Sequence, residues 1–503
     1  ESVLSVWTAM PVAAAIGWMA ISRGRDLVLP CLLGLVVLYA TIYLGSTIAP
    51  IDLAKVLPEQ AVYATPVVVW SVLLLAYAFV ASVLPVWLLL QPRDFINSLQ
   101  LAIAVAMLLI GLAVASLSGA ADLSSSAPAI ASAVPADAPP MFPFLFITIA
   151  CGACSGFHCL VSSGTTSKQL RSAGDAQMVG YGSMLGEGML AVLVVLACCA
   201  GVGMGKLTRT QTEQGTLITR EDVSLDDVSG EGSPAWRAYY RTGLPASGSA
   251  VSISKIAESD QSVDDNPLAD EAVAVDDSSS AGGWKQQGLD KKLAAFIDGG
   301  ANFMSTIGMP LKFGVAIMAV MVACFAATTL DTATRLQRYV LAELAGTIGW
   351  KFGTNKFVAT GIAVGVGLAI AIFAGDAPGK GGLMLWPLFG ATNQLLAGLA
   401  LMVATFYLAR RNRPLAVVAV PMMLMMLMPA WAMTFDLTQN WWPNRDWVLV
   451  IFGLGTLAIQ GWMVAEACVL WRRMPRDGQT PSDLSENDSS GLHQEDDSVA
   501  MTA

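Results

Sequence analysis

Eleven stretches of mostly apolar residues, each long enough to cross a lipid bilayer, dominate this chain. A membrane-spanning helix needs about 20 such residues. Backbone polar groups inside a bilayer must pair within the protein, which favours helices over open sheets. The pattern therefore predicts an all-α polytopic membrane protein. Its expected spans are approximately residues 2–21, 27–47, 64–90, 98–118, 141–163, 178–204, 312–334, 357–375, 383–409, 415–434 and 447–470.

Charged residues gather in two polar segments. Only 13% of the 503 residues are charged, about half of what a soluble domain carries. Residues 205–311 hold 25 of the 66 charges and residues 471–503 hold 10. The other 363 residues hold too few to coat soluble domains of that size, which excludes a soluble enzyme. Nucleic-acid binding has no support, because no basic stripe with interleaved aromatic residues is present.

Lysines and arginines in the short connections predict the orientation. Fifteen of them fall on one set of sides and only Lys55, Lys380 and Arg445 on the other. The positive-inside rule then places residue 1 outside, and it places the tail from Arg472 in the cytoplasm. The expected location is the cell inner (cytoplasmic) membrane. The fifteen are Arg23, Arg25, Arg93, Lys168, Arg171, Arg335, Arg338, Lys351, Lys356, Arg410, Arg411, Arg413, Arg472, Arg473 and Arg476.

These patterns divide the chain into five parts. Spans 1 to 6 occupy residues 1–204, and residues 205–287 form a polar, flexible extracytoplasmic loop. Residues 288–311 form an amphipathic or re-entrant segment. Spans 7 to 11 occupy residues 312–470, with a cytoplasmic amphipathic helix near 335–349, and residues 471–503 form an acidic cytoplasmic tail.

The fifth span combines glycines, hydroxyl side chains and a histidine. Irregular backbone at membrane depth is tolerated only against protein or a water-filled cavity. A broken helix also offers amides and a positive dipole end to a carboxylate. We therefore predict a substrate pathway here, with close packing of two helices on small residues as the alternative. The residues are Gly152, Ser155, Gly156, His158, Ser162, Ser163, Gly164, Thr165 and Thr166.

The ninth span begins with a proline and carries two amides. Pro387 is suited to opening a half-helix. Asn393 and Gln394 either hydrogen-bond across helices or line the substrate pathway. We place them on the wall opposite the fifth span.

Ionisable residues inside spans are expensive and often functional. Glu187, a few residues into the sixth span, could carry a proton or reach water at the cytoplasmic end. His158 could relay protons or satisfy a buried backbone group. Asp331, with Thr328 and Thr329, could coordinate a cation or cap the following helix. These five residues are the predicted ion- or proton-coupling group.

Enzyme, metal and cofactor signatures are absent from the sequence. There is no nucleophile elbow, zinc-protease motif or dinucleotide fingerprint. Cys151, Cys154, His158 and Cys159 fit a metal site poorly, because they share one apolar segment with no second cluster. We expect no catalytic activity, no cofactor and no bound metal.

Several long motifs resemble the carbon starvation protein A family. The resemblance implies an inner-membrane transporter of many helices, distantly related to the amino acid–polyamine–organocation superfamily. Family members are linked to peptide uptake under carbon starvation, and close relatives to pyruvate uptake with protons. It covers most of residues 1–205 and 290–410. The motifs are residues 79–94, 152–168, 181–182 with Glu187, 328–335 and 385–398.

The chain departs from the family pattern in three places. The family has spans upstream of residue 1, including a glycine-rich motif with a histidine, and this chain begins at Glu1. We therefore expect a fragment that lacks N-terminal spans. Ser167 stands where the family pattern has a proline. The polar loop at 205–285 matches no family motif.

The sequence is best interpreted as a secondary-active transporter for small carboxylate nutrients, either short peptides or pyruvate. Uptake would respond to carbon starvation, with protons or another cation as the coupled ion. Arg93 and Asp94 are predicted to form part of a cytoplasmic gate. A non-transporting sensor of nutrient status and a passive channel are the alternatives.

Overall fold

A computed structural model describes residues 3–23, 28–48, 57, 65–127, 130, 138–212, 215–221, 233–240, 288–375 and 377–473. Within these residues, eleven helical segments are long and apolar enough to cross a membrane. Their number confirms the eleven spans that the sequence predicts. The segments are Val3–Ala20, Val28–Thr47, Pro66–Val83, Leu90–Leu117, Met141–Lys168, Asp175–Gly201, Leu311–Thr347, Lys356–Phe373, Leu388–Arg410, Ala416–Trp441 and Trp447–Arg472.

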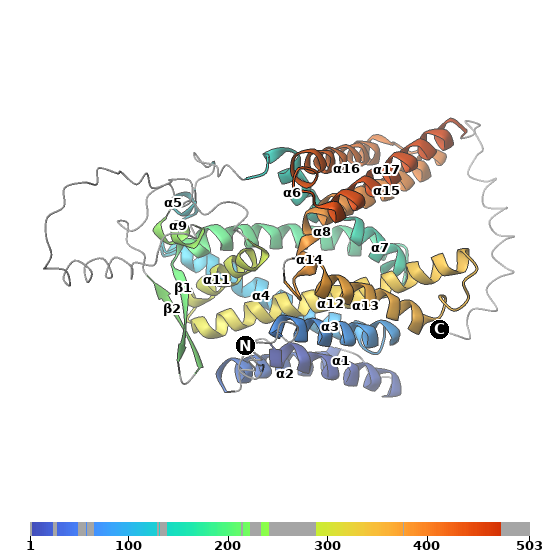
Figure 1. Cartoon of the computed structure of the whole chain (residues 1–503). Helices are drawn as coiled ribbons and strands as arrows, with labels where there is room; N and C mark the ends of the chain where they lie inside the picture. The colour runs from blue at the N-terminus through green and yellow to red at the C-terminus, as the bar shows by residue number, and fades with distance from the viewer. Residues whose placement is uncertain are drawn as a thin grey trace, which may run out of the picture. The chain divides into compact units, whose positions relative to one another are not determined.

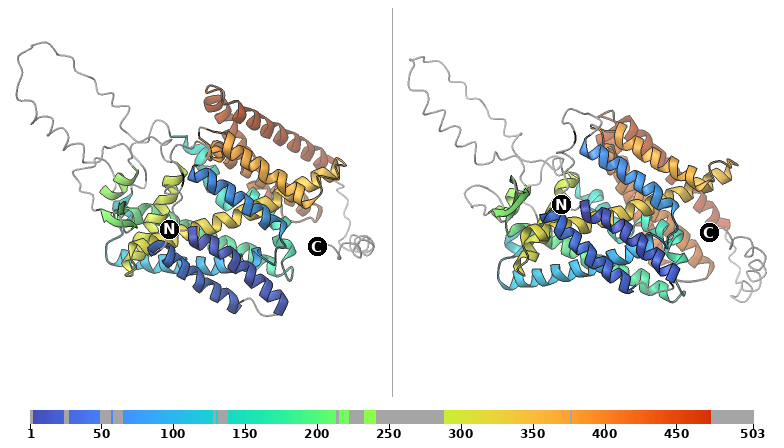
Figure 2. Two further views of the ribbon diagram at one scale, coloured as in Figure 1. Left: turned by 60° about the horizontal axis from the view of Figure 1, so that its bottom comes forward. Right: turned by 90° about the horizontal axis from the view of Figure 1, so that it is seen from below.

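The chain packs as two compact units that are each discontinuous in sequence. Unit 1 comprises Glu1–Pro139 and Gln177–Gly379, and unit 2 comprises Pro140–Ala176 and Lys380–Ala503. This division cuts across the five parts expected from composition, because the fifth span packs against the ninth and tenth spans rather than against its sequence neighbours. Figures 1 and 2 show the elements of both units.

Unit 1 is built around one long helix. This helix, α12, runs from the seventh span through the segment near 335–349, which the sequence also predicts to continue that span as a helix. It packs against α1, α2, α3, α4, α11 and α13. The elements are α1 (Val3–Arg23), α2 (Val28–Thr47), α3 (Pro66–Val83), α4 (Leu90–Leu117), α5 (Leu123–Ser126), α8 (Asp175–Leu196), η4 (Ala197–Gly201), β1 (Lys206–Thr212), β2 (Gly215–Glu221), α9 (Pro234–Tyr240), α11 (Leu289–Thr306), α12 (Leu311–Thr347) and α13 (Lys356–Phe373).

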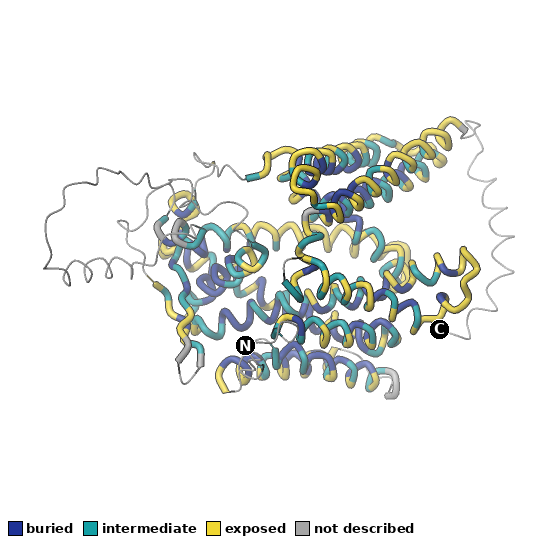
Figure 3. Tube along the Cα trace, viewed as in Figure 1, coloured by how far each residue is buried: buried dark blue, intermediate teal, exposed yellow. Residues whose placement is uncertain are grey.

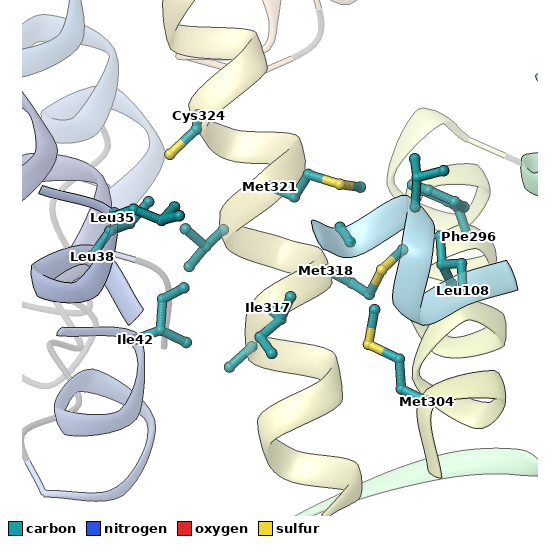
Figure 4. Packing of buried hydrophobic residues seen from close by; sticks show 14 of the residues in the cluster. Leu35, Leu38, Ile42, Leu108, Phe296, Met304, Ile317, Met318, Met321 and Cys324 are labelled. Carbon is teal, nitrogen blue, oxygen red and sulfur yellow. The ribbon is translucent and has the colours of Figure 1, made fainter. Parts of the chain in front are cut away.

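The largest apolar cluster lies along α12. Ile317 and Met318 are buried there, with Leu38 of α2, Leu108 of α4 and Phe296 of α11 around them. Figure 4 shows Leu38 on one side of α12, and Leu108 and Phe296 on the other. Close packing of this kind positions the helices of unit 1 relative to one another.

The fourth span starts eight residues earlier than the sequence predicts, at Leu90 instead of 98. Leu84 precedes Pro85, and its extended backbone ends α3. Pro92 lies in the first turn of α4, where a missing N–H costs nothing. Arg93 and Asn97 therefore lie on a helix inside the bundle, not in a connection.

Part of the segment expected to be a flexible loop is ordered. β1 and β2 form an antiparallel hairpin that pairs Lys206 with Glu221 and Thr212 with Gly215. Leu207 and Ile218 of this hairpin are buried against α11 and α12. Residues 222–232 and 241–287 of the expected loop, and the expected tail from residue 474, lie outside the described residues.

The segment after the loop forms α11, as the helical spacing predicts. Its second half, residues 295–304, is buried on nearly every side. Gly299 lies directly against the backbone of η4, since a Cβ on it would stand 2.0 Å from the carbonyl oxygen of Ala197. Small residues thus let α11 pack inside unit 1 instead of lying on its surface.

Unit 2 is built around α15, which packs against α6, α7, α16 and α17. The fifth span is interrupted between α6 and α7 by Cys154 and Ser155, whose backbones are not helical. The elements are η2 (Met141–Leu145), α6 (Phe146–Ala153), α7 (Gly156–Gly164), η3 (Thr166–Lys168), α14 (Gly381–Met384), α15 (Trp386–Arg410), α16 (Ala416–Asp436), η7 (Leu437–Trp441) and α17 (Trp447–Arg473).

Candidate functional site

A buried ion pair joins α4 and α12 in unit 1. Nη1 of Arg93 lies 2.5 Å from Oδ2 of Asp331, and the two side chains are 4% and 0% exposed. Taking such charges out of water costs several kcal/mol per ion unless they are paired and hydrogen-bonded. This position therefore requires an explanation beyond membrane anchoring.

Tyr77 of α3 completes a three-helix cluster. Its hydroxyl accepts a hydrogen bond from Nη1 of Arg93. The same hydroxyl donates to Oδ2 of Asp331 at 2.7 Å. One phenol thus bridges the guanidinium and the carboxylate.

Two amides continue the polar face of α4. Asn97 and Gln100 follow Arg93 by four and seven residues, so all three lie on one side of the helix. Nδ2 of Asn97 donates to Oγ1 of Thr328 on α12 at 3.0 Å. Gln100 is 0% exposed. A strip of polar groups therefore extends from the ion pair into the bundle.

Many atoms of this cluster have no hydrogen-bond partner among the described residues. They include Nε and Nη2 of Arg93, Oδ1 of Asp331, Oδ1 of Asn97 and both amide atoms of Gln100. Each buried, unpaired polar group costs about 1–3 kcal/mol. Such a concentration is typical of a site that receives a polar ligand or water.

Arg335, one turn after Asp331, fixes α3 against α12. Its Nη2 donates to the carbonyl oxygens of Ala81 at 2.8 Å and Leu84 at 2.9 Å. These carbonyls belong to the last turn of α3, where a cation also complements the helix dipole. Arg335 therefore positions the helix that carries Tyr77.

An apolar pocket of about 370 Å³ borders the cluster through two aromatic rings. The ring of Trp7, which lines this pocket, meets that of Tyr77 edge to face at 6.1 Å. Ala327 and Leu330 of α12 line it next to Thr328 and Asp331. The other lining residues are Val3, Val6, Trp70, Leu74, Ala323 and Ala326.

Unit 2 has a separate polar centre at its helix break. Oδ1 of Asn393 accepts the backbone N–H of Phe157 at 2.9 Å, and Nδ2 donates to Sγ of Cys151 at 3.2 Å. Ser155 Oγ lies 3.1 Å from the same amide nitrogen. The sequence predicts that a backbone amide at the helix break is available to a substrate. In this structure the amide of Phe157 at the break donates to Asn393.

Close packing holds α7 on α15 beside this centre. A Cβ on Gly156 would stand 2.3 Å from the carbonyl oxygen of Asn393. Gln394 is 0% exposed, and neither of its amide atoms has a partner within the described part of the chain. Pro387 lies in the first turn of α15, where the sequence predicts a helix start.

The structure distributes the other predicted site residues unevenly. The hydroxyls of Ser162, Ser163 and Thr165 donate to carbonyls of their own helix. The side chain of Thr329 does likewise. Gly164 and Thr166 are half-buried. The predicted site residues that are exposed are Asp94, Gly152, His158, Ser162, Ser163, Glu187 and Thr329.

Glu187 and His158 thus lie on exposed helix surface within their own units, and most of α8 around Glu187 is exposed (Figure 3). The predicted gate residue Arg93 and the predicted coupling residues Asp331 and Thr328 instead meet in one cluster. Among the described residues, no group of three or more His, Cys, Asp or Glu side chains could hold a metal ion.

Sequence reasoning missed Tyr77, Asn97 and Gln100. The amides had a usable signal, because they recur at helical spacing after Arg93. Tyr77 had none, since a single tyrosine in a span is unremarkable. Its role depends on partners 16 and 254 residues away.

Comparison with known proteins supports the resemblance seen in the sequence. The family described as "Carbon starvation protein CstA" matches residues 1–218 and 245–432. The chain is 29% identical over 412 residues to "Peptide transporter CstA" of Helicobacter pylori strain J99, covering 80% of this chain and 54% of that protein. The corresponding Mycobacterium tuberculosis H37Rv protein is 34% identical over 359 residues, which cover 68% of this chain and 42% of that protein.

A relative with a different name is similar over a longer stretch. "Pyruvate/proton symporter BtsT" of Escherichia coli K12 is 31% identical over 450 residues, covering 86% of this chain and 59% of that protein. The chain spans about half the length of these relatives. No solved structure is significantly similar to it.

Proposed function

Because this chain belongs to the carbon starvation protein CstA family, we propose that it acts in secondary-active uptake of small carboxylate nutrients during carbon starvation. Peptides and pyruvate, which appear in the names of its relatives, both carry a carboxylate. Since the chain spans about half of those proteins, its substrates and coupling ion are inferred from its own residues as well. Peptide and pyruvate remain two alternatives, and a proton is the favoured coupling ion.

The buried Arg93–Asp331 pair is the observation that carries this proposal. Both charges lie inside helices that are apolar enough to span a membrane. Intramembrane charges are rare and usually mark substrate or ion pathways. The unpaired polar atoms around the pair offer the binding capacity that a mere anchor would not need.

The broken fifth span is proposed as a second part of the substrate pathway. Transporters commonly bind substrates where helices are interrupted. In unit 2 the break is held by Asn393, and the amide of Gln394 is unpaired next to it among the described residues. In this proposal a substrate carboxylate replaces Oδ1 of Asn393 as the acceptor of the Phe157 N–H.

Alternating access requires parts that can move relative to each other. We propose that the two separately packed units are such parts. The helix break also agrees with the proposed distant relation to the amino acid–polyamine–organocation superfamily. The distribution of basic residues supports insertion in the cytoplasmic membrane with the C-terminus in the cytoplasm.

Uptake by proteoliposomes that contain the whole chain tests this function. Labelled pyruvate and labelled dialanine should accumulate above the outside concentration when a proton gradient is imposed, and an uncoupler should abolish the accumulation. Equilibration without accumulation would indicate a channel. Binding without any uptake would indicate a sensor, which the names of the relatives do not favour.

A further inference from the structure

Only one of the three guanidinium nitrogens of Arg93 has a partner among the described residues. Nη1 makes the contacts to Asp331 and Tyr77. Nε and Nη2 have no partner within the described residues. In a guanidinium these two nitrogens form one edge, with parallel N–H bonds that fit both oxygens of a carboxylate. The Nε and Nη2 edge of Arg93, buried beside the existing ion pair, is therefore suited to binding a carboxylate through two N–H bonds.

The surroundings of this edge suit a small organic acid. Asn97 and Gln100 lie on the same face of α4, and Oδ1 of Asn97 and both amide atoms of Gln100 have no partner in the described part of the chain, so they suit a second polar group of the ligand. Trp7, which lines the apolar pocket, packs against the ring of Tyr77, and the hydroxyl of Tyr77 binds Arg93. One charged fork, neighbouring amides and an apolar wall are the usual composition of a ligand site.

A second carboxylate on Arg93 would leave one positive and two negative charges in a buried place. Like charges about 4–6 Å apart in low dielectric favour the neutral form of one partner. Asp331 is the nearest acid, and its Oδ1 is unpaired among the described residues and available to hold a proton. The incoming negative charge would be balanced by one proton.

Resting on the proposed function, we propose that Arg93 receives the substrate carboxylate through Nε and Nη2 while Asp331 takes up the coupled proton. The proton comes from the aqueous phase and forms the O–H bond on Asp331; no other covalent bond changes. The net charge of the cluster is zero before and after binding. Tyr77 keeps Arg93 and Asp331 in register through its hydroxyl.

Other charged and titratable groups near Asp331 are few among the described residues. Arg93, Tyr77 and Arg335 act on it directly, and Asp94 and Cys324 lie close to Arg93. The other titratable groups on α12 itself are Lys312, Arg338, Tyr339 and Glu343. Those on the elements packed against α12 are Cys31, Tyr39 and Tyr43 on α2, Lys356 on α13, Asp290, Lys291, Lys292 and Asp298 on α11, and Arg220 and Glu221 on β2.

Equilibrium binding to the purified whole chain in detergent tests this inference without requiring transport. The probes are labelled pyruvate and labelled dialanine, with a pH indicator in weakly buffered solution. The wild-type protein should bind one or both probes and take up about one proton per bound carboxylate. Dialanine amide, which lacks the carboxylate, should not compete.

Three variants distinguish the roles. Arg93→Lys keeps the charge but lacks the fork, so affinity should fall by roughly tenfold to hundredfold. Asp331→Asn resembles the protonated state, so it should still bind the probe but take up no proton. Arg338→Lys, a change at another buried arginine of unit 1, should bind as the wild type does.

Several results would overturn the inference. They are failure of the folded wild-type protein to bind either probe, unchanged affinity in Arg93→Lys, and proton uptake by Asp331→Asn equal to that of wild type. Loss of binding in Asp331→Asn with an unchanged melting temperature would also overturn it. Binding that follows these predictions without uptake in proteoliposomes would contradict the proposed transport function but not the assigned site.

Discussion

Asn393 caps a helix that belongs to a different part of the chain, because its side-chain oxygen accepts the backbone N–H of Phe157 at 2.9 Å. Phe157 lies in the first turn of α7, where backbone N–H groups have no partner within the helix. The same amide donates to Cys151 on the preceding helix. Asn393 thus joins both sides of the break to α15.

Asn393→Ala should destabilise unit 2. The variant leaves the N–H of Phe157 without its acceptor and removes the contacts to Ser155 and Cys151. The expected loss is roughly 1–3 kcal/mol, measured as a lower melting temperature in detergent. Thr392→Ala is the matched control, because that hydroxyl donates only within α15. Equal melting temperatures for both variants would contradict the capping role.

Gly299→Ala should disrupt the contact between α11 and η4. The added Cβ would stand 2.0 Å from the carbonyl oxygen of Ala197, a backbone atom that cannot move away alone. Overpacking of this kind costs about 1–3 kcal/mol, again visible in the melting temperature. At Gly365 of α13 a Cβ meets nothing within 4 Å among the described residues. Gly365→Ala should therefore be neutral or slightly stabilising.

Asp298 on α11 should make stability depend on pH. It lies outside the candidate spans, and burial raises its pKa above the usual 3.8 despite the nearby Arg209. The folded protein then binds this proton more tightly than the unfolded chain does. Its contribution to the free energy of unfolding is therefore full below pH 3.8 and is lost as pH rises through the raised pKa.

Melting temperatures of the wild type and Asp298→Asn between pH 3.5 and pH 7 test this expectation. The difference between the two should change with pH, because asparagine cannot titrate. Asp290→Asn, a change at an exposed residue of the same helix, should follow the wild type. Parallel curves for wild type and Asp298→Asn would show that the carboxyl does not titrate in this range.

The sequence predicted the spans well because bilayer thickness imposes length and apolarity on each one separately. It also located the helix break, since glycines and hydroxyls interrupt one local stretch. The start of α4 was wrong because Arg93 and Asn97 resemble a polar connection. Their partners, Asp331 and Thr328, lie more than 200 residues away in the sequence. A local sequence pattern cannot predict such pairs.

The same limit applies to the predicted coupling group. Glu187, His158 and Asp331 were equivalent as ionisable residues within apolar spans. Only the packing of α3, α4 and α12 distinguishes Asp331, which is 0% exposed and paired, from Glu187 and His158, which are exposed within their units. If Asp331 carries the proton, a variant at Asp331 should lose proton coupling. If Glu187 or His158 carries it, a variant at one of those residues should lose it instead.

Asp331→Asn should abolish the effect of a proton gradient on uptake by proteoliposomes. A neutral amide cannot exchange a proton, while Arg93 can still receive a carboxylate, so uptake should become passive and stop at equilibrium. Glu187→Gln and His158→Ala should still accumulate substrate when the gradient is imposed, because neither residue belongs to the cluster of Arg93, Tyr77 and Asp331. The measurement is the ratio of inside to outside substrate with and without the gradient. Accumulation by Asp331→Asn together with its loss in Glu187→Gln would move the proton site to α8.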